Sequence, residues 1–301
     1  MKVLNFGSLN VDYVYSVDHM IIGGETQLAE KMEAFCGGKG LNQSVALARA
    51  GITVYHAGIT GNDGDMLVEV CKENKIDTSY LKYMPVKGGH TIIQVDKDAQ
   101  NSIILYGGTN QMLTREFIDS VLSNFEKGDY IVLQNEVNLL DYIIEQAFEK
   151  GMKIVLNPAP YNEKIEECDL RKVKTLILNE IEGNQCTDEK EPEKILHVLN
   201  QKYPETEIVL TIGSDGAFYY DGVRRIFQSV FETHAVDTTA AGDTFTGYYL
   251  ASVIKGQTVE DALRIAARAA AMAVSRAGAI PSIPVLEEVI QSVKDKIFLY
   301  R

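Results

Sequence analysis

The sequence lacks several features that define other classes of protein, and each absence narrows the possible functions. Its 29 lysine and arginine residues stand against 42 aspartate and glutamate residues, which gives a formal net charge of −13. This balance argues against nucleic acid or an anionic membrane surface as the main partner. No apolar run reaches the roughly 20 residues of a membrane helix, and the start, Met1–Phe6, turns polar too soon for a signal peptide. We therefore expect a cytoplasmic protein with no nucleic acid and no membrane as partner.

Cysteine and histidine are also too few and too scattered to form a recognisable motif. The four cysteines contain no Cys-x-x-Cys pair, and the five histidines show no His-Glu-x-x-His spacing. We expect reduced thiols and structural or exposed histidines. The first predicted strand is followed by Gly7-Ser8-Leu9-Asn10 rather than Gly-x-Gly-x-x-Gly, which argues against a nucleotide-dependent dehydrogenase.

Short apolar runs alternate with helical patterns through most of the chain. Buried strands are predicted at Lys2–Gly7, Thr53–Gly58, Tyr130–Gln134, Lys153–Asn157, Thr175–Leu178 and Glu207–Ile212. Helices are predicted at Asn42–Ala50, Asn138–Lys150, Glu193–Lys202, Phe245–Ile254, Val259–Arg276 and Val285–Ile297. This alternation predicts an α/β fold in which helices cover both faces of a mostly parallel central sheet.

Two segments interrupt the alternation and predict a second, smaller sheet. Val14–Phe35 and Leu81–Tyr106 lack the helical period and contain short alternating runs. Within the second segment, Lys97–Asn101 suits the turn of a hairpin. The alternative is a pair of surface loops, but loops of this length without structure of their own are uncommon. We expect a small β-sheet that stands off one domain spanning residues 1–301, inserted from about 14–35 and 81–106.

The most informative stretch is Asp237–Phe245, which runs directly into a predicted helix. Its small residues allow the backbone to approach a ligand and to turn N–H groups towards it. The Asp243 carboxylate lies where these groups and the positive end of the helix dipole point. Such a carboxylate can accept the proton of an alcohol while a phosphoryl group is held beside it.

Two further motifs suggest a site for a polyol. Gly37–Gln43 is a glycine-rich turn that opens a helix; it departs from the Walker A pattern, so an ordinary strand-to-helix turn, with Lys39 in solvent, explains it equally well. A polyol can hydrogen-bond to the side chain of Asn42 and to the nearby backbone at Gly38. Asn10 and Asp12 lie on one side of an extended chain and can hold neighbouring hydroxyls. The alternative for this pair is a turn stabilised by Asx hydrogen bonds.

Two motifs follow later strands, where open α/β sheets bind ligands. Thr211–Gly216 suits a phosphate or nucleotide contact, and equally a plain hairpin turn into Ala217–Tyr220. Asn179, Glu180 and Glu182 offer acidic side chains that can hold Mg²⁺ through water. The alternative for them is helix capping, because carboxylates are favoured at helix N-termini.

Taken together, these residues resemble the ribokinase-like (PfkB) carbohydrate kinases. The resemblance rests on the pairing of Gly37–Gln43 with Asp237–Phe245. It extends in the same order to Gly7–Asp12, Gly24–Thr26, Asn157–Pro160, Leu178–Glu180, Thr211–Gly216 and Gly278–Ser282. The family resemblance implies a three-layer fold with a β-sheet lid and a homodimer formed through that lid.

The resemblance also implies a reaction, the transfer of phosphate from ATP to a sugar hydroxymethyl group. It favours ribose as the sugar, through Asn10, Asp12 and Asn157–Pro160. By position, Asp243 is the general base, and the anion hole consists of Ala240, Ala241, Gly242 and Asp243. The implied sugar site contains Asn10, Asp12, Gly38, Lys39, Asn42, Glu136 and Asp243. The implied nucleotide contacts are Asn179, Thr211, Gly213, Gly216 and Gly242.

Metal ions follow from the same resemblance. Glu182 is expected to organise Mg²⁺ through water. A monovalent cation, K⁺, is expected at Asp237, Thr239, Ala273, Arg276, Gly278 and Ser282.

The chain departs from the family pattern at two positions, which leaves the substrate open. His90 stands where a small lid residue is usual, and its bulk is expected to narrow or repolarise the sugar pocket. Ala267 stands where many relatives place a polar residue near adenine. The alternatives are a kinase for another sugar, a 2-keto-3-deoxy sugar acid or a nucleoside, or a catalytically silent sugar-binding regulator. The intact Asp243 and Gly242 argue against the silent protein.

Overall fold

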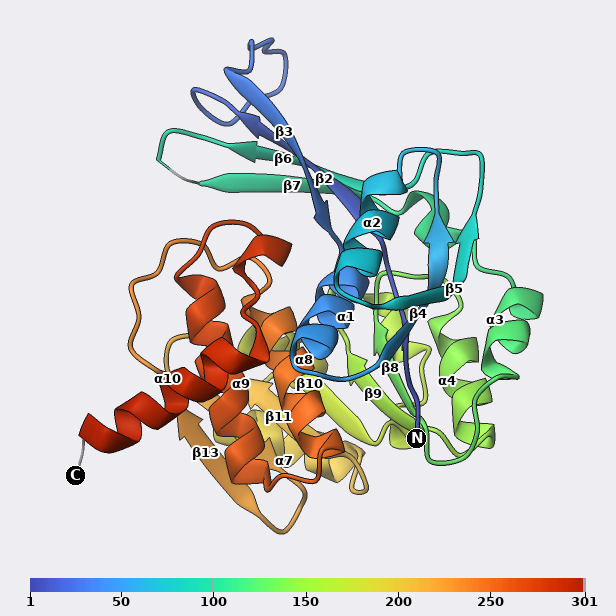
Figure 1. Ribbon diagram of the computed structural model, residues 1–301, viewed down its shortest axis with the longest axis vertical. Helices are drawn as coiled ribbons and strands as arrows, with labels where there is room; N and C mark the ends of the chain where they lie inside the picture. Colours follow the sequence, from blue (N-terminus) through green and yellow to red (C-terminus); the bar gives the residue numbers. More distant parts are fainter. Residues whose placement is uncertain (99, 300–301) are drawn as a thin grey trace.

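A nine-stranded sheet forms the centre of the protein in a computed structural model that describes residues 1–98 and 100–299 (Figure 1). In spatial order its strands are β13 (Arg225–Ser229), β12 (Gly216–Tyr220), β11 (Glu207–Thr211), β10 (Thr175–Asn179), β9 (Lys153–Asn157), β8 (Tyr130–Gln134), β1 (Val3–Phe6), β4 (Val54–Thr60) and β5 (Asp77–Tyr83). The strands from β5 to β11 pair in parallel, and only β12 and β13 pair antiparallel at one edge. The predicted mostly parallel sheet is confirmed.

Two apolar cores, one on each face of the sheet, make the fold three-layered. Neighbouring residues of a strand point to opposite faces: Val3 belongs to one core and Leu4 to the other. The first core is covered by α1 (Lys39–Arg49), α2 (Asp65–Glu73), α8 (Ala241–Ile254), α9 (Val259–Val274) and α10 (Leu286–Leu299). The second is covered by α3 (Arg115–Leu122), α4 (Leu140–Glu149), α5 (Glu163–Glu166) and α7 (Pro192–Lys202).

The remaining helical elements are short. They are α6 (Glu180–Thr187) and the 3₁₀ turns η1 (Gly108–Gln111), η2 (Leu170–Lys172) and η3 (Ile280–Ser282). Within the described residues, no helix is both long and apolar enough to cross a membrane.

A separate four-stranded sheet stands off this body as a lid (Figure 1). Its order is β3 (Lys31–Gly37), β2 (Asn10–Ser16), β6 (Gly89–Val95) and β7 (Asn101–Tyr106). The predicted lid sheet is confirmed, including the β6–β7 hairpin, although Ala99 of its predicted turn lies outside the described residues. Two bounds differ from the prediction: the lid already begins at Asn10, and 81–83 belong to β5 of the main sheet. The reason is that β5 is half-exposed and polar, so its sequence carries no clear strand period.

Candidate active site

Two helix N-termini meet around the Asp243 carboxylate. Asn42 and Gln43, in the first turns of α1, each donate a side-chain amide hydrogen bond to it, at 3.0 Å to Oδ2 and 2.9 Å to Oδ1. The Asp243 side chain is only 7% exposed. Because each oxygen accepts a hydrogen bond from a different amide, these two bonds hold the carboxylate in a fixed orientation.

The backbone before α8 is shaped to expose the start of the helix. Ala240 adopts the left-handed conformation, with φ 58°, and its carbonyl accepts from Thr244 N at 2.8 Å. Gly242 faces open space, since a Cβ placed on it meets no atom of the described residues within 4 Å. The N–H of Ala241 differs from the prediction: it already donates to the carbonyl of Thr238, at 3.2 Å. Within the described residues, Gly242 and Asp243 are therefore the first-turn positions whose N–H groups have no backbone acceptor and can face an anion.

Asn10 and Asp12 lie on one face of β2, as predicted. Asn10 Oδ1 accepts from Asn110 Nδ2 at 2.7 Å, and Asp12 Oδ1 accepts from Thr91 Oγ1 at 2.6 Å. Burial raises the pKa of the Asp12 carboxyl, and the Thr91 hydrogen bond opposes that rise. Both side chains are anchored by tertiary contacts, so the Asx turn considered as an alternative does not describe this pair.

Glu136 lies against the glycine-rich turn before α1. The Lys39 N–H donates to Glu136 Oε2 at 2.9 Å, and the Ser8 hydroxyl donates to the same oxygen. Gly38, with φ 92°, precedes the helix, and a Cβ on it would lie 3.1 Å from the backbone nitrogen of Asn10. The turn therefore brings the predicted sugar-site backbone of Gly38 next to Asn10.

The Lys39 ammonium is half-buried and is influenced by three carboxylates. Burial alone lowers its pKa, but Asp243, Glu136 and Glu182 outweigh burial and raise it. Burial raises the pKa values of Glu136 and Glu182, and Lys39 opposes both rises. Lys39 is thus a cation within the site. The alternative of an ordinary turn with Lys39 free in solvent does not describe it.

Beneath this turn, a chain of hydrogen bonds runs through a fully buried histidine. Asn5 donates to Ser44 Oγ at 2.8 Å, and Ser44 Oγ lies 2.7 Å from His56 Nδ1. His56 Nε2 lies 3.3 Å from the Gly7 carbonyl, which can only accept. The proton therefore belongs on Nε2, and Nδ1 accepts from Ser44. Burial lowers the pKa of His56 to about 4, against the opposing effect of the Gly7 hydrogen bond.

This depressed pKa predicts acid sensitivity of the fold. Between pH 6.5 and about 4, the unfolded chain binds a proton at this position and the folded chain does not, so stability falls as the pH falls. At 1.36 kcal/mol per pKa unit, the gap corresponds to about 3 kcal/mol in the free energy of unfolding. We expect the stability difference between the wild type and His56→Gln, measured by urea unfolding, to shrink by about this amount from pH 7 to pH 4. A difference that stays constant over this range would contradict the prediction.

The predicted nucleotide residues lie after β10 and β11. Asn179 caps α6 in a capping box with Glu182, so the capping alternative is present in the structure. Gly213, in the turn between β11 and β12, has a φ of 53°. Gly216, the first residue of β12, has a φ of 140°, and Thr211 ends β11. The hairpin turn considered as an alternative for Thr211–Gly216 is therefore present, between the antiparallel strands β11 and β12. A nucleotide role for these residues remains a prediction.

Some of the residues expected around a monovalent cation are hydrogen-bonded to one another. Asp237 Oδ1 accepts from both N and Oγ1 of Thr239, and Oδ2 accepts from Gly278 N at 2.8 Å. Burial raises the pKa of Asp237, but these hydrogen bonds outweigh it and lower the pKa. Ala273 O accepts from Arg276 N at 3.0 Å, and the buried Ser282 hydroxyl donates to a neighbouring carbonyl. In the described part of the chain, no group of three His, Cys, Asp or Glu side chains could hold a metal ion.

The expectation for His90 is wrong. His90 pairs with Val11 and Tyr106, whereas Asp12 pairs with Thr91, so the imidazole lies on the face of the lid opposite Asp12. Its ring contacts Tyr106 and Tyr13, with centroids 5.0 and 5.9 Å away. The sequence alone could not decide which face the ring occupies, because a shift of one residue in register reverses the faces. Ala267 is buried in the core between the sheet and α9, and its relation to adenine remains a prediction.

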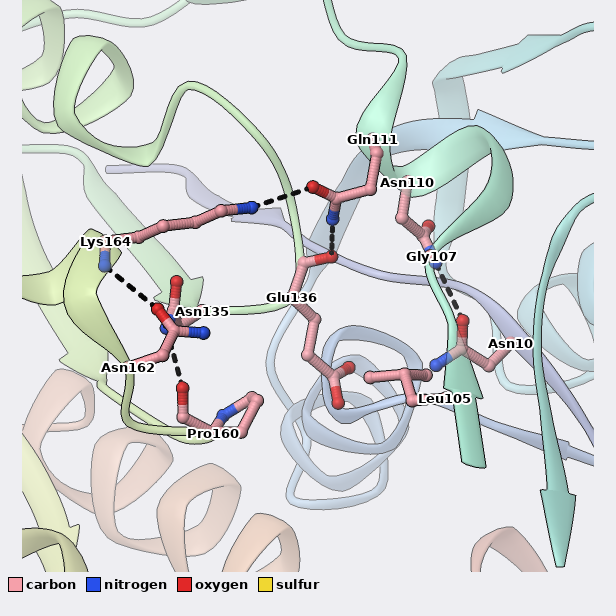
Figure 2. Close-up of a pocket in the computed structure, with 10 residues that line it drawn as sticks. All are labelled: Asn10, Leu105, Gly107, Asn110, Gln111, Asn135, Glu136, Pro160, Asn162 and Lys164. Atoms are coloured by element: carbon pink, nitrogen blue, oxygen red, sulfur yellow. Dashed lines mark hydrogen bonds between the residues drawn. The ribbon is translucent and has the colours of Figure 1, made fainter. Parts of the chain in front are cut away.

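A cavity of about 190 Å³ lies under the lid, beside Asn10 and Glu136 (Figure 2). Its lining residues are Asn10, Leu105, Gly107, Asn110, Gln111, Asn135, Glu136, Pro160, Asn162 and Lys164. An apolar cavity of about 150 Å³ holds one benzene molecule, so this volume suits a single sugar ring. Two predicted sugar residues thus line a cavity of the right size.

Several residues at the site were missed by sequence reasoning. Gln43 and Ser8 stand inside the motifs and could have been singled out from them. Asn110 and Asn135 stand in segments without a motif, and only the fold brings them to Asn10 and Glu136.

The three-layer α/β fold, the β-sheet lid and the aspartate at the start of α8 agree with the class of carbohydrate kinases that the sequence motifs indicate. The chain belongs to the pfkB family of carbohydrate kinases, whose family model matches residues 1–286.

Individual relatives agree with this assignment. The chain is 34% identical to the ribokinase of Staphylococcus aureus (strain COL) over 302 residues, covering 96% of this chain and 99% of the relative. The crystal structure of ribokinase from Thermotoga maritima superposes with a TM-score of 0.86 at 31% identity, covering 98% and 99% of the two chains. The Arabidopsis thaliana ribokinase complexed with ribose and ATP superposes with a TM-score of 0.85 at 26% identity, covering 96% and 97%.

Proposed function

We propose that this carbohydrate kinase transfers the γ-phosphoryl group of ATP to the hydroxymethyl group of ribose, giving ribose 5-phosphate. The observation that carries the proposal is the buried Asp243 carboxylate, held at the start of α8 by Asn42 and Gln43. The complex of the Arabidopsis relative with ribose and ATP supports the choice of sugar.

Asp243 acts as the general base in this reaction. Its carboxylate accepts the proton of the ribose hydroxyl as the hydroxyl oxygen attacks the γ-phosphorus and the bond to ADP breaks. The amides of Asn42 and Gln43 hold the carboxylate in place with donors that carry no charge of their own. Transition-state charge on the phosphoryl group is stabilised by the N–H groups of Gly242 and Asp243 and by the positive end of the α8 dipole.

The sugar is held by the residues that line or border the cavity. Asn10, Asp12 and Glu136 offer acceptors for its hydroxyls, and Asn42 has a buried Oδ1 without a partner among the described residues. Lys39 and the backbone of Gly38 border the proposed sugar site on the side next to α1. An unsatisfied buried acceptor is costly in the free protein, so a sugar hydroxyl that donates to Asn42 gains affinity.

The nucleotide and the ions occupy the remaining predicted residues. Asn179, Thr211, Gly213 and Gly216 border ATP on the side of β10 and β11. Glu182 is a buried carboxylate that fits Mg²⁺ held through water, and the ion would neutralise charge on the phosphates. K⁺ is proposed to bind the oxygens of Asp237, Thr239 and Ser282 and the carbonyls of Ala273, Arg276 and Gly278. The hydrogen bonds that join Asp237 to Thr239 and to Gly278 support this proposal.

The experiment that tests this function is a coupled ADP-release assay. The panel contains pentoses, hexoses, sugar acids and nucleosides, each with and without K⁺. We expect the highest kcat/KM with ribose. Turnover of another sugar but not of ribose would show that ribose is not the substrate. Binding of a sugar without any turnover would favour a catalytically silent sugar-binding protein.

The lid also supports a homodimer. On the lid face opposite Asp12, Met32, Ile92, Ile104 and Tyr106 are exposed, and Ile92 pairs directly with Ile104. An exposed apolar sheet face of this kind is typical of an interface. Pairing of two such lids would bury it.

Replacing Ile104 with lysine is expected to convert the dimer into a monomer, because a charge would be buried between the lids. Sedimentation velocity would show the mass falling to the 33.4 kDa of one chain. Val223→Lys, at an exposed position in the β12–β13 turn, is the matched control and should leave the dimer intact. A wild-type protein that already sediments as a monomer would rule out the proposed dimer.

A further inference from the structure

Three polar side chains lie in the apolar core beneath Asp243. Asn5, His56 and Gln134 belong to the neighbouring strands β1, β4 and β8, and all three are completely buried. Two residues earlier, on the same face of β1 and β8, the residues are the apolar Val3 and Val132. Burying a polar side chain is unfavourable unless the side chain is hydrogen-bonded. The proposed reaction uses none of the three, so their place at the centre of the sheet calls for an explanation.

Hydrogen bonds connect these strands to the carboxylate of Asp243. Gln43 Nε2 donates to Asp243 Oδ1 at 2.9 Å, and Gln43 Oε1 accepts from Gln134 Nε2 at 2.7 Å. The second hydrogen of Gln134 Nε2 goes to Asn5 Oδ1, at 3.1 Å. Asn5 in the first strand of the sheet is therefore connected to the carboxylate through two further amides.

Two backbone carbonyls fix the direction of this network, because a carbonyl can only accept. Asn5 Nδ2 donates to the Gly40 carbonyl at 2.7 Å and to Ser44 Oγ at 2.8 Å. The Gly7 carbonyl, 3.3 Å from His56 Nε2, places the proton of the imidazole on Nε2. His56 Nδ1 then accepts from the Ser44 hydroxyl, whose oxygen accepts from Asn5. The Asn5 amide can therefore present only Oδ1 to the next side chain of the network.

The orientation of Asn5 determines the orientation of the next two amides. Gln134 must turn Nε2 towards Asn5 Oδ1, and the same nitrogen donates to Gln43 Oε1. With its oxygen held in this way, Gln43 presents Nε2 to Asp243. Gln134 Oε1 is left buried with no partner among the described residues. The protein keeps this orientation although an unsatisfied buried acceptor lowers its stability.

We propose that Gln134 and Asn5 are positioning residues for Asp243. They act through Gln43, whose amide they hold in the orientation that donates to the carboxylate. Without Gln43, only Asn42 would hold the carboxylate, at Oδ2, and a carboxylate held at one oxygen can rotate. The inference rests on the proposed function, in which Asp243 accepts the proton of the sugar hydroxyl.

A double-mutant cycle separates positioning from a purely structural role. Gln134→Met, Asp243→Asn and the double variant are compared with the wild type by single-turnover transfer to the best sugar of the panel. Gln134→Met should slow transfer by about ten- to a hundredfold, the effect of losing a hydrogen bond to a charged group. In the Asp243→Asn background it should change the rate by less than about twofold, because the carboxylate that Gln134 positions is already absent. Equal losses in the two backgrounds would overturn the inference.

Thr206→Val is the matched control for the loss of a buried hydrogen bond. The buried Thr206 hydroxyl donates to the Val173 carbonyl at 2.9 Å just before β11 begins, at the end of the sheet opposite the site. The control should lower the free energy of unfolding and leave the rate of transfer unchanged. A rate lowered as much as in Gln134→Met would overturn the positioning role. If Gln134→Met does not fold, Asn5→Val replaces it in the cycle, because valine suits a buried strand and removes the acceptor that orients Gln134.

The outcomes distinguish this inference from the proposed function. A wild-type rate in Gln134→Met, beside a slow Asp243→Asn variant, would overturn the positioning role and leave Asp243 as the general base. If Asp243→Asn is as fast as the wild type, or if the wild type phosphorylates no sugar, the proposed function fails. The crystal structure of Gln134→Met then tests the positioning alone. We expect the Gln43 amide to have left hydrogen-bonding distance of Asp243 Oδ1, and an unchanged Gln43 would overturn the inference.

Discussion

Replacing Asp243 with asparagine is expected to lower kcat for the sugar by about 10²–10⁴-fold, the contribution of a positioned general base. The substitution keeps the size of the side chain but removes the carboxylate that we propose accepts the hydroxyl proton. It also places an N–H₂ group against one of the two amides that now donate to the carboxylate. Because the proposed role of Asp243 is at the reacting hydroxyl rather than at the nucleotide base, the affinity for ATP should remain close to that of the wild type.

The measurement is single-turnover phosphoryl transfer together with equilibrium binding of ATP. Asp65→Asn is a matched control, since Asp65 also stands in the first turn of a helix but outside the site. It should retain wild-type kcat. A value of kcat within threefold of wild type in Asp243→Asn would contradict the assignment of Asp243 as the general base.

The second large effect is expected from Gly247→Ala, which acts through helix packing. Gly247 in α8 lies against α1, and a Cβ on it would approach Ala46 Cβ to 2.4 Å and Leu47 N to 2.9 Å. Alanine favours helices by up to about 1 kcal/mol over glycine, but overpacking of this kind costs about 1–3 kcal/mol. We expect a net loss of stability, because the obstructing atoms include backbone.

The same substitution should also reduce catalysis. Forcing α8 away from α1 lengthens the hydrogen bonds from Asn42 and Gln43 to Asp243. A displacement of 1 Å at such a group can cost about 10²-fold, so we expect kcat to fall by about ten- to a hundredfold. Gly242→Ala is the control for stability, because a Cβ there meets open space. A Gly247→Ala protein as stable and as active as wild type would show that the two helices are not closely fitted.

Much of the fold could be predicted from local pattern. The predicted strands Tyr130–Gln134 and Lys153–Asn157 coincide with β8 and β9, since their continuous apolar runs are typical of strands buried on both faces. The half-exposed strands β5 and β13 were missed, because packing on one side leaves their sequences mixed. The lid hairpin was found because a polar turn separates two alternating runs.

The sequence by itself determined the α/β class, the lid, the family and the place of Asp243 at a helix start, because these depend on period, spacing and motif within short segments. The tertiary structure alone decided what surrounds that carboxylate. Asn42 and Gln43 stand 201 and 200 residues from Asp243, and only the packing of α1 on α8 brings them together. The register of the lid strands alone placed His90 away from Asp12. Only the fold left Asn135 Oδ1 buried with no hydrogen-bond partner among the described residues. Such contacts depend on how distant elements pack, and local periodicity carries no record of that.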